Sequence, residues 1–341
     1  VPMSERVVDR AAWVQQKTER LPPSQVQTVI SAAEPKTAAA AQTQWQRPAQ
    51  SFGYSLIPTW QQNIGGPDGF LLFRAGVAVP ARWWLGERTA LSATLNLNLA
   101  DNFGKFKYTA PSDLPRVRTY LREYMTTSRI NLTSLQATHF GQLAANQYYS
   151  AYAGYLETMY AGVGGEWLYR PWHSPLALGV DINRVQQRDF DQLLGFGKAG
   201  GQTGYRVTTG HASTYWDTGW QSTRVKLSAG RYLAGDLGAT LDLSKTFDNG
   251  VTVGAWATKT NVSAQRFGEG SFDKGLYLRI PFDVMTTTRT GNSANLVYNP
   301  LTRDGGARLN REFTLYGATT ARSARDTAYE PAPLILPQPQ R

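Results

Sequence analysis

Alternation of apolar and polar residues begins near Ser51 and continues to about residue 318. The clearest stretch is TALSATLNLNLA, in which Leu91, Ala93, Leu95, Leu97 and Leu99 alternate with Ser92, Thr94, Asn96 and Asn98. Successive side chains of a β-strand point to opposite faces, so this period of two predicts a strand with one apolar and one polar face. Similar segments include residues 71–79, 175–183, 238–247, 251–260 and 275–282.

Most of these segments are about 8 to 11 residues long, which is the length of a tilted membrane-spanning strand rather than of an average globular strand. Some connections are tight, such as Asp248-Asn249-Gly250, and others are long and rich in Gly and Pro, such as residues 99–115. Short turns at one end and long loops at the other are typical of an outer-membrane barrel. A soluble β-sandwich or a large periplasmic β domain shares the alternation and remains the alternative.

The predicted fold is therefore an all-β, antiparallel transmembrane β-barrel, or half of a larger barrel, over residues 49–318. Residues 1–48 are predicted to form a short helical extension and linker, because Val7, Val8, Ala11, Ala12 and Val14 have helical spacing and Ser4 is a suitable N-cap. Residues 24–35 suggest a second short helix. Residues 319–341 are expected to be a Pro-rich tail, and Tyr316 to end the last strand. The chain opens at Val1 without a leader, so we expect either a removed leader or a fragment.

Composition supports the membrane interpretation. Charged residues make up only 18% of the chain, and Trp83, Trp84, Trp167, Tyr169 and Trp172 lie near predicted strand ends, where aromatic belts form. The chain has no cysteine, which excludes disulfides and thiolate metal sites but does not fix the compartment. The net charge of +10 would suit nucleic acid, an anionic membrane surface or an acidic polymer. No nucleic-acid-binding motif is present, so nucleic acid is not an expected partner.

Residues 162–196, GVGGEWLYRPWHSPLALGVDINRVQQRDFDQLLGF, make the sequence recognisable. With TGHASTYWDTGW, FGEGSFDKGLYLRIPFDV and NPLTRDGGARLN, they resemble the YjbH family of exopolysaccharide-biosynthesis proteins, relatives of the GfcD-type proteins of group 4 capsule loci. The resemblance implies a Gram-negative outer-membrane β-barrel acting in polysaccharide production or export. It also implies that this chain is the C-terminal half of a protein about twice as long, and it supplies no catalytic residues.

Charged residues interrupt the alternating strands, and in a barrel they are expected on the inner face, because charge facing lipid costs about 2 to 4 kcal/mol at the bilayer midplane. They could cross-link a narrow barrel or contact a glycan. The candidate glycan-binding or lumen residues are Arg74, Glu166, Arg170, Asp181, Arg206, Arg224, Lys226, Arg231, Asp242, Glu269, Asp273 and Arg279.

The sequence evidence for a catalytic site is weaker than that for a barrel. Glu269 and Asp273 could form an acid pair for glycan hydrolysis, but their Gly-rich surroundings favour a turn. His211, Ser213 and Asp217 lie on one predicted strand without a third element to orient the base. Residues 299–309 are interpreted as a loop held by internal ion pairs. No catalytic, cofactor or metal site is predicted.

Three functions remain open. The first is a non-enzymatic outer-membrane barrel that guides a polysaccharide along a basic, aromatic-bearing lumen. The second is an outer-membrane enzyme that modifies or cleaves the polymer, and the third is a scaffold that docks periplasmic export proteins. The expected partners are a polysaccharide, the outer-membrane bilayer, periplasmic export proteins and the missing N-terminal half.

Overall fold

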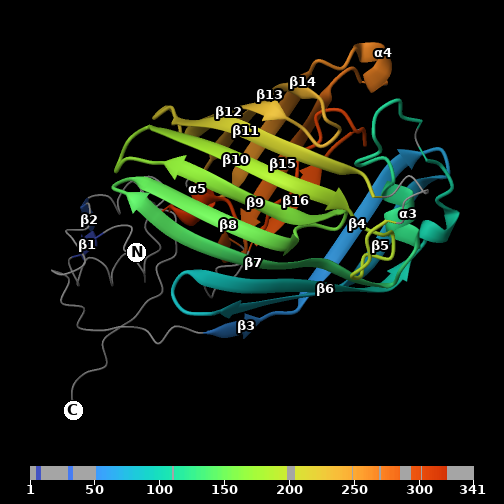
Figure 1. Cartoon of the computed structure of the whole chain (residues 1–341), viewed down its shortest axis with the longest axis horizontal. Helices are drawn as coiled ribbons and strands as arrows, with labels where there is room; N and C mark the ends of the chain where they lie inside the picture. Colours follow the sequence, from blue (N-terminus) through green and yellow to red (C-terminus); the bar gives the residue numbers. More distant parts are fainter. Residues whose placement is uncertain are drawn as a thin grey trace.

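The fold is built almost entirely of β-strands (Figure 1). The computed structural model describes residues 5–8, 30–33, 51–109, 111–197, 204–247, 249–268, 270–284, 293–300 and 302–320. In these residues a sheet of 14 strands, β3 to β16, follows the chain order, with almost every strand antiparallel to the next. The predicted all-β antiparallel fold is therefore confirmed.

The strands are long, as the alternation predicted. The first half of the sheet contains β3 (Phe52–Tyr54), β4 (Ile57–Gly66), β5 (Gly69–Trp84), β6 (Thr89–Asp101), β7 (Ile130–Ala144), β8 (Gln147–Tyr155) and β9 (Tyr160–Tyr169). The second half contains β10 (Leu176–Gln187), β11 (Arg206–Asp217), β12 (Thr223–Arg231), β13 (Leu237–Thr246), β14 (Thr252–Thr260), β15 (Asp273–Pro281) and β16 (Ser293–Tyr298).

The sheet has two edges in the part of the chain that the structure describes. Both β3 and β4 pair with β5 at one edge, and β16 pairs with β15 at the other. Within these strands the sheet does not close on itself.

The faces of the sheet have inverted polarity relative to a soluble protein. On β6, Leu97 is 40% exposed whereas the neighbouring Asn96 is 8% exposed. Leu95 and Leu99 are exposed on the same side as Leu97, and Ser92 is buried on the side of Asn96. β10 repeats the pattern, with the even-numbered residues from Leu176 to Ile182 exposed and Asn183 buried. The predicted outward direction of the apolar row is confirmed.

The buried face is concave and surrounds residues 302–320, which we call the inner segment. Glu312 reaches Arg82 on β5 and Ser92 on β6, while Arg311 and Tyr316 contact β9, β10 and β11. One short segment can touch five strands of a sheet only if the sheet curves around it. The buried face is therefore called the inner face, and the apolar face the outer face.

The connections differ between the two ends of the sheet. Residues 102–129, 188–205 and 261–272 join strands at what we call the long-loop end. Residues 85–88, 145–146, 170–175, 218–222 and 247–251 join them at the short-turn end. The last of these is the predicted hairpin turn, in which Gly250 has a φ of +84°, and Asp248 lies outside the described residues. Short turns at residues 156–159 and 232–236 also lie at the long-loop end, and residues 282–292 form a longer connection at the short-turn end, so the predicted separation of loops is confirmed only in part.

Two boundary predictions are wrong. Near the start of the chain, the predicted helices are contradicted at β1 (Glu5–Val8) and β2 (Ile30–Ala33), which pair antiparallel with each other. The rest of the predicted extension lies outside the described residues. Val7, Val8 and Ile30 are β-branched and favour extended backbone once a partner strand is present. The last described strand ends at Tyr298, and Tyr316 instead lies in the short helix α5 (Leu315–Ala318) of the inner segment. The predicted tail beyond residue 320 lies outside the described residues.

Helices are few and short. Besides α5, the described residues contain α3 (Leu121–Thr126), α4 (Ala264–Phe267) and the 3-10 turns η1 (Phe103–Lys105) and η2 (Phe282–Val284). None of the described helices has both the length and the apolar character needed to cross a bilayer.

Candidate functional site

The candidate site is the inner face together with the inner segment that lies on it. Asp304 anchors this segment at the long-loop end, where its carboxylate accepts hydrogen bonds from the backbone N–H groups of Val117, Arg118 and Thr119 at 2.7–3.0 Å. Thr319 anchors it at the short-turn end, where its hydroxyl accepts a 3.1 Å hydrogen bond from Arg170. The inner segment therefore runs along the inner face from one end of the sheet to the other.

Arg311 forms the centre of this contact. Its guanidinium lies 3.1 Å from a carboxylate oxygen of Glu166 on β9 and 3.8 Å from Asp181 on β10. The Glu166 side chain is 3% exposed and also accepts a hydrogen bond from the backbone N–H of Leu315 at 2.9 Å. Arg311 therefore forms ion pairs with two buried acidic groups on neighbouring strands.

Tyr316 is the aromatic anchor of the inner segment. Its ring stacks on Tyr215 of β11 with 3.9 Å between ring centroids and an interplanar angle of 6°. The guanidinium of Arg170 lies 4.2 Å from the Tyr316 ring centroid, and that of Arg224 lies 5.2 Å from it. Arg170 also donates a 2.8 Å hydrogen bond to the Tyr316 carbonyl. Two predicted lumen arginines therefore hold an aromatic side chain of the protein itself.

The remaining inner-face candidates form smaller contacts. Lys226 lies 5.1 Å from the Tyr215 ring centroid, and Asp242 accepts a 2.9 Å hydrogen bond from the Tyr277 hydroxyl. Asp273 accepts hydrogen bonds from Trp256 at 2.9 Å and Asn299 at 3.2 Å. Arg74 lies within β5 and is buried, with its guanidinium 5.7 Å from the Phe103 ring centroid. Arg279 lies near the end of β15, is exposed and donates a hydrogen bond to the Ser293 hydroxyl.

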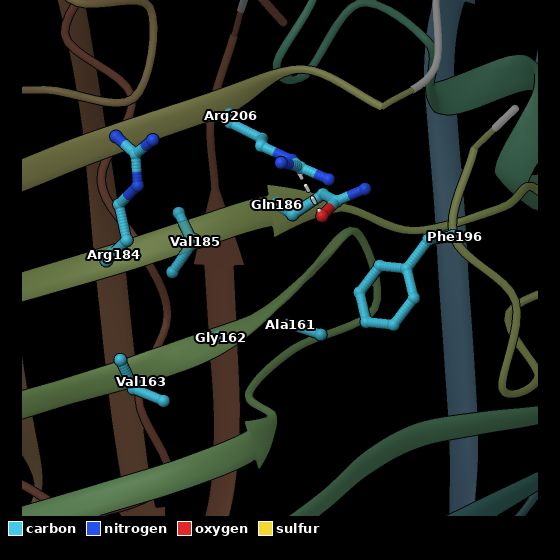
Figure 2. A pocket seen from close by; sticks show the side chains of 8 residues that line it. All are labelled: Ala161, Gly162, Val163, Arg184, Val185, Gln186, Phe196 and Arg206. Carbon is cyan, nitrogen blue, oxygen red and sulfur yellow. Dashed lines mark hydrogen bonds between the residues drawn. The ribbon is translucent and has the colours of Figure 1, made fainter. Parts of the chain in front are cut away.

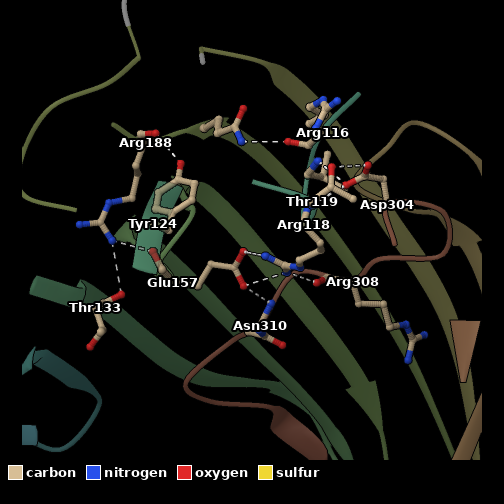
Figure 3. Close-up of polar contacts among 12 residues, drawn as sticks. Arg116, Arg118, Thr119, Tyr124, Thr133, Glu157, Arg188, Asp304, Arg308 and Asn310 are labelled. Carbon is tan, nitrogen blue, oxygen red and sulfur yellow. Dashed lines mark hydrogen bonds and ion pairs between the residues drawn. The ribbon is translucent and has the colours of Figure 1, made fainter. Parts of the chain in front are cut away.

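A second polar network closes the long-loop end (Figure 3). Arg118 donates to both carboxylate oxygens of Glu157, at 2.6 and 3.1 Å, and to the Arg308 carbonyl. Burial alone would lower the pKa of Arg118, but the charge and hydrogen bonds of Glu157 outweigh it and raise that pKa above its usual value. Glu157 also accepts a hydrogen bond from the backbone N–H of Asn310, so this ion pair fixes residues 308–310 of the inner segment.

Arg188 stabilises the same end in a different way. Its guanidinium donates to the carbonyl oxygens of Leu132, Glu157, Gln192 and Leu193 at 2.7–2.9 Å. Burial lowers the pKa of Arg188, and neighbouring tyrosines and acids offset this only in part. Arg188 thus ties the loop after β10 to β7 and to the turn between β8 and β9.

The structure corrects the placement of two candidates. Arg206 and Arg231 lie on the outer face near the long-loop end and are exposed, so neither lines the inner face. On β11 the buried residues are odd-numbered, from Val207 to Tyr215, and on β12 Ser228 marks even-numbered positions as buried. Strand alternation therefore turns both arginines outward.

The described residues bear on one of the two catalytic candidates. Glu269 lies outside these residues, so its pairing with Asp273 stays a hypothesis. Nδ1 of His211 lies 3.5 Å from Asp181, and the Ser213 hydroxyl forms a 2.9 Å hydrogen bond with Ser228. These contacts do not join His211 to Ser213, as a catalytic triad would require. Within the described ranges, no cluster of three or more His, Cys, Asp or Glu side chains could hold a metal ion.

Sequence reasoning missed the residues that organise the site. Arg311 and Tyr316 lie in a segment expected to be a strand, where nothing marked them as partners of β9, β10 and β11. The interpretation of residues 299–309 as a loop held by internal ion pairs was also incomplete, because the hydrogen bonds of Asp304 go to the loop at residues 117–119. The Gly305-Gly306 pair, in which Gly306 has a φ of +74°, was the available signal of a sharp turn into the inner face.

These features define a class: a β-sheet protein with an apolar outer face and a polar inner face filled by its own chain. A family model described as "Exopolysaccharide biosynthesis protein YbjH" matches residues 1–321, and the chain belongs to this YjbH family. It is 42% identical over 294 residues to the "Uncharacterized lipoprotein YjbH" of Escherichia coli strain K12, covering 85% of this chain and 42% of that protein. The chain thus spans less than half the length of this curated relative.

Solved structures give a weaker likeness. A loop-deletion mutant of OmpT, an outer membrane protein of Vibrio cholerae, aligns with 67% of this chain and 87% of its own, at 9% identity and a TM-score of 0.32. In-vitro folded OmpT from the same organism aligns with 67% of this chain and 81% of its own, at 10% identity and a TM-score of 0.29. These scores are too low for an argument about this chain.

Proposed function

We propose that the sheet is a wall of a transmembrane β-barrel in the bacterial outer membrane, and that the protein acts without catalysis in the secretion or assembly of an exopolysaccharide. The observation that carries the proposal is the inverted polarity of the sheet. Leucines, valines and isoleucines are exposed on the outer faces of β6, β10, β12 and β13, while Asn, Ser and Thr are buried on the inner face. A continuous exposed apolar face of this extent is rare on a soluble monomer and suits contact with lipid.

The two edges of the sheet need partners if the sheet lies in a membrane. An open strand edge presents unpaired N–H and C=O groups, which are costly in hydrocarbon. We propose that β16 and the β3–β4 edge pair with further strands or with each other in the membrane. A source for such strands is a longer protein, since this chain covers 42% of its Escherichia coli relative.

The glycan would follow the inner face. Arg170, Arg224 and Lys226, together with Tyr215, present cations and an aromatic ring of the kind that bind acidic groups and sugar rings. In the structure the inner segment occupies these groups, so passage along the inner face requires this segment to move. The same occupancy favours a second candidate, a closed scaffold that docks periplasmic export proteins.

Conductance in planar bilayers separates the two candidates. We expect the unaltered chain to be mostly closed and Tyr316→Ser to open more often, because the variant loses the stacking on Tyr215 and the contacts to Arg170 and Arg224. Loss of an aromatic pair costs about 1 kcal/mol beyond area burial, which predicts a roughly five-fold rise in open probability. Added acidic polysaccharide should block the open state.

The matched control is Tyr54→Ser, which removes an exposed tyrosine of β3 and should leave conductance unchanged. If Tyr316→Ser stays closed while the sheet is inserted, the scaffold candidate is favoured over the glycan path. Release of new reducing ends from the polysaccharide would instead show an enzyme and contradict the non-catalytic proposal.

A further inference from the structure

The outer face carries a row of cations at the long-loop end. Arg184 lies near the end of β10, Arg206 begins β11, Arg231 ends β12, and Lys259 lies one residue before the end of β14. All four are exposed, and alternation puts them on the same face as the apolar residues Ile182, Leu227 and Val253. The apolar outer face is therefore bordered by positive charge at this end.

Negative charge is absent from the outer face of the same strands. From β9 to β14 the described strands contain four acidic residues, and all of them occupy inner-face positions: Glu166, Asp181, Asp217 and Asp242. The outward cations thus have no carboxylate on their own face of these strands. An arginine that faces lipid costs about 2 to 4 kcal/mol at midplane but about 0 to 1 near the interface, so the row fits the level of the lipid headgroups.

A pocket of about 350 Å³ lies within this row (Figure 2). Arg184 and Arg206 line it from neighbouring strands, and Val163 and Phe196 supply apolar walls. The ring of Phe196 stacks on Tyr155 with 5.8 Å between centroids, which holds the loop after β10 against the outer side of the sheet. The pocket therefore combines two guanidinium groups with apolar surface that continues down β9 and β10 toward Val163 and Ile182.

Both guanidinium groups are positioned by neutral partners. Arg184 donates a 2.9 Å hydrogen bond to the Thr208 hydroxyl, and Arg206 donates one of the same length to the side-chain oxygen of Gln186. Among the described residues neither arginine forms an ion pair. A guanidinium has five N–H donors, so each group keeps donors for an anion, and arginine binds phosphate through two parallel hydrogen bonds.

We infer that this pocket binds the phosphate headgroup of a membrane lipid, with the acyl chains lying along Val163 and Ile182. The inference rests on the proposed membrane location and adds a ligand that this location does not itself require. Such a site would also account for part of the net positive charge of the chain, since anionic headgroups attract Lys and Arg at the membrane surface. The pocket is separate from the inner face and its proposed glycan path.

The test measures lipid binding by the full chain with Arg184→Gln and Arg206→Gln combined. The matched control combines Arg129→Gln and Arg266→Gln, which removes two exposed arginines from loops of the same end outside the pocket. Each protein is titrated in detergent with phosphatidylglycerol and with phosphatidylcholine, and bound lipid is counted by native mass spectrometry. Insertion is measured separately by flotation with vesicles of each lipid.

We expect the unaltered chain and the control to bind phosphatidylglycerol in preference to phosphatidylcholine. The pocket variant should bind phosphatidylglycerol about ten- to thirty-fold more weakly, since each interfacial arginine contributes about 1 kcal/mol. Equal binding by the pocket variant and the control, with normal flotation, would overturn the lipid site alone. Failure of every protein to float would overturn the membrane location and the site together.

Inorganic phosphate identifies the source of the ligand. If the pocket binds lipid, excess inorganic phosphate should displace little phosphatidylglycerol, because the apolar walls also hold the acyl chains. Complete displacement at concentrations comparable to the lipid would show a site for free phosphate, and would contradict the lipid assignment.

Discussion

The Arg311→Met variant should lose about 3–5 kcal/mol of unfolding free energy. Arg311 is the cation that faces Glu166 and Asp181, and its removal leaves two acidic side chains of the inner face without their ion pair. Asp181 retains His211 and Asn183, so most of the loss should come from Glu166, which keeps the hydrogen bond from the Leu315 N–H and the charge of Lys226. Urea unfolding in detergent micelles, followed by the heat-dependent shift in gel migration, measures the change.

Two variants make the Arg311 result specific. Adding Glu166→Gln to Arg311→Met should recover part of the stability, because a neutral amide is less costly to bury than a carboxylate. Arg82→Met removes a partly exposed ion pair with Glu312 in the same segment and should cost about 1 kcal/mol or less. If Arg311→Met and Arg82→Met have equal effects, the central ion pairs do not hold the inner segment in place.

The Leu241→Arg variant should lose about 2 to 4 kcal/mol in a bilayer, because Leu241 is exposed on the outer face at the middle of β13. The measurement is the unfolding free energy after reconstitution into vesicles, together with the fraction of protein that inserts.

Leu237→Arg is the matched control for depth. Leu237 is also exposed on the outer face of β13, but it begins the strand at the long-loop end, near the level of Arg231. An arginine there should cost about 0 to 1 kcal/mol. Equal effects at Leu241 and Leu237 would indicate that both positions face water.

The strands and the direction of their faces could be predicted from the sequence. The period of two in residues 89–100 is a local property, and it fixes which side chains share a face once any strand forms. Which face is buried is a separate question. For β6 the answer followed from strand length, since rows of Leu on strands this long are expected to face lipid.

The site was predicted only in part, because charged residues were placed on the inner face by their charge alone and not by the alternation of their strands. Placing every charged residue inside is correct for Glu166 and Asp181, which lie at mid-sheet. It fails for Arg206 and Arg231, because charge on the outer face costs little at strand ends. On β11 the polar residues His211, Ser213 and Asp217 share the odd-numbered face, and this alternation places the even-numbered Arg206 on the opposite, outer face.

The inner segment could not be predicted because its contacts join residues distant in sequence. Seven strands, β10 to β16, lie between Glu166 and Arg311 in the sequence, and no local pattern marks such a pair. The helix prediction at residues 5–8 was wrong for a related reason. The helical spacing of Val7 and Val8 is a local preference, and pairing with residues 30–33 overrides it.

The most direct test of lipid contact by the outer face uses the absence of cysteine from the chain. Single cysteines at Leu243 and Ser244, neighbours on opposite faces of β13, are labelled with a fluorophore in reconstituted vesicles. The label at position 243 should be quenched by brominated acyl chains and not by aqueous iodide, while the label at position 244 should not respond to the brominated chains. Quenching at position 243 by iodide, without any effect of the brominated lipid, would contradict the membrane location.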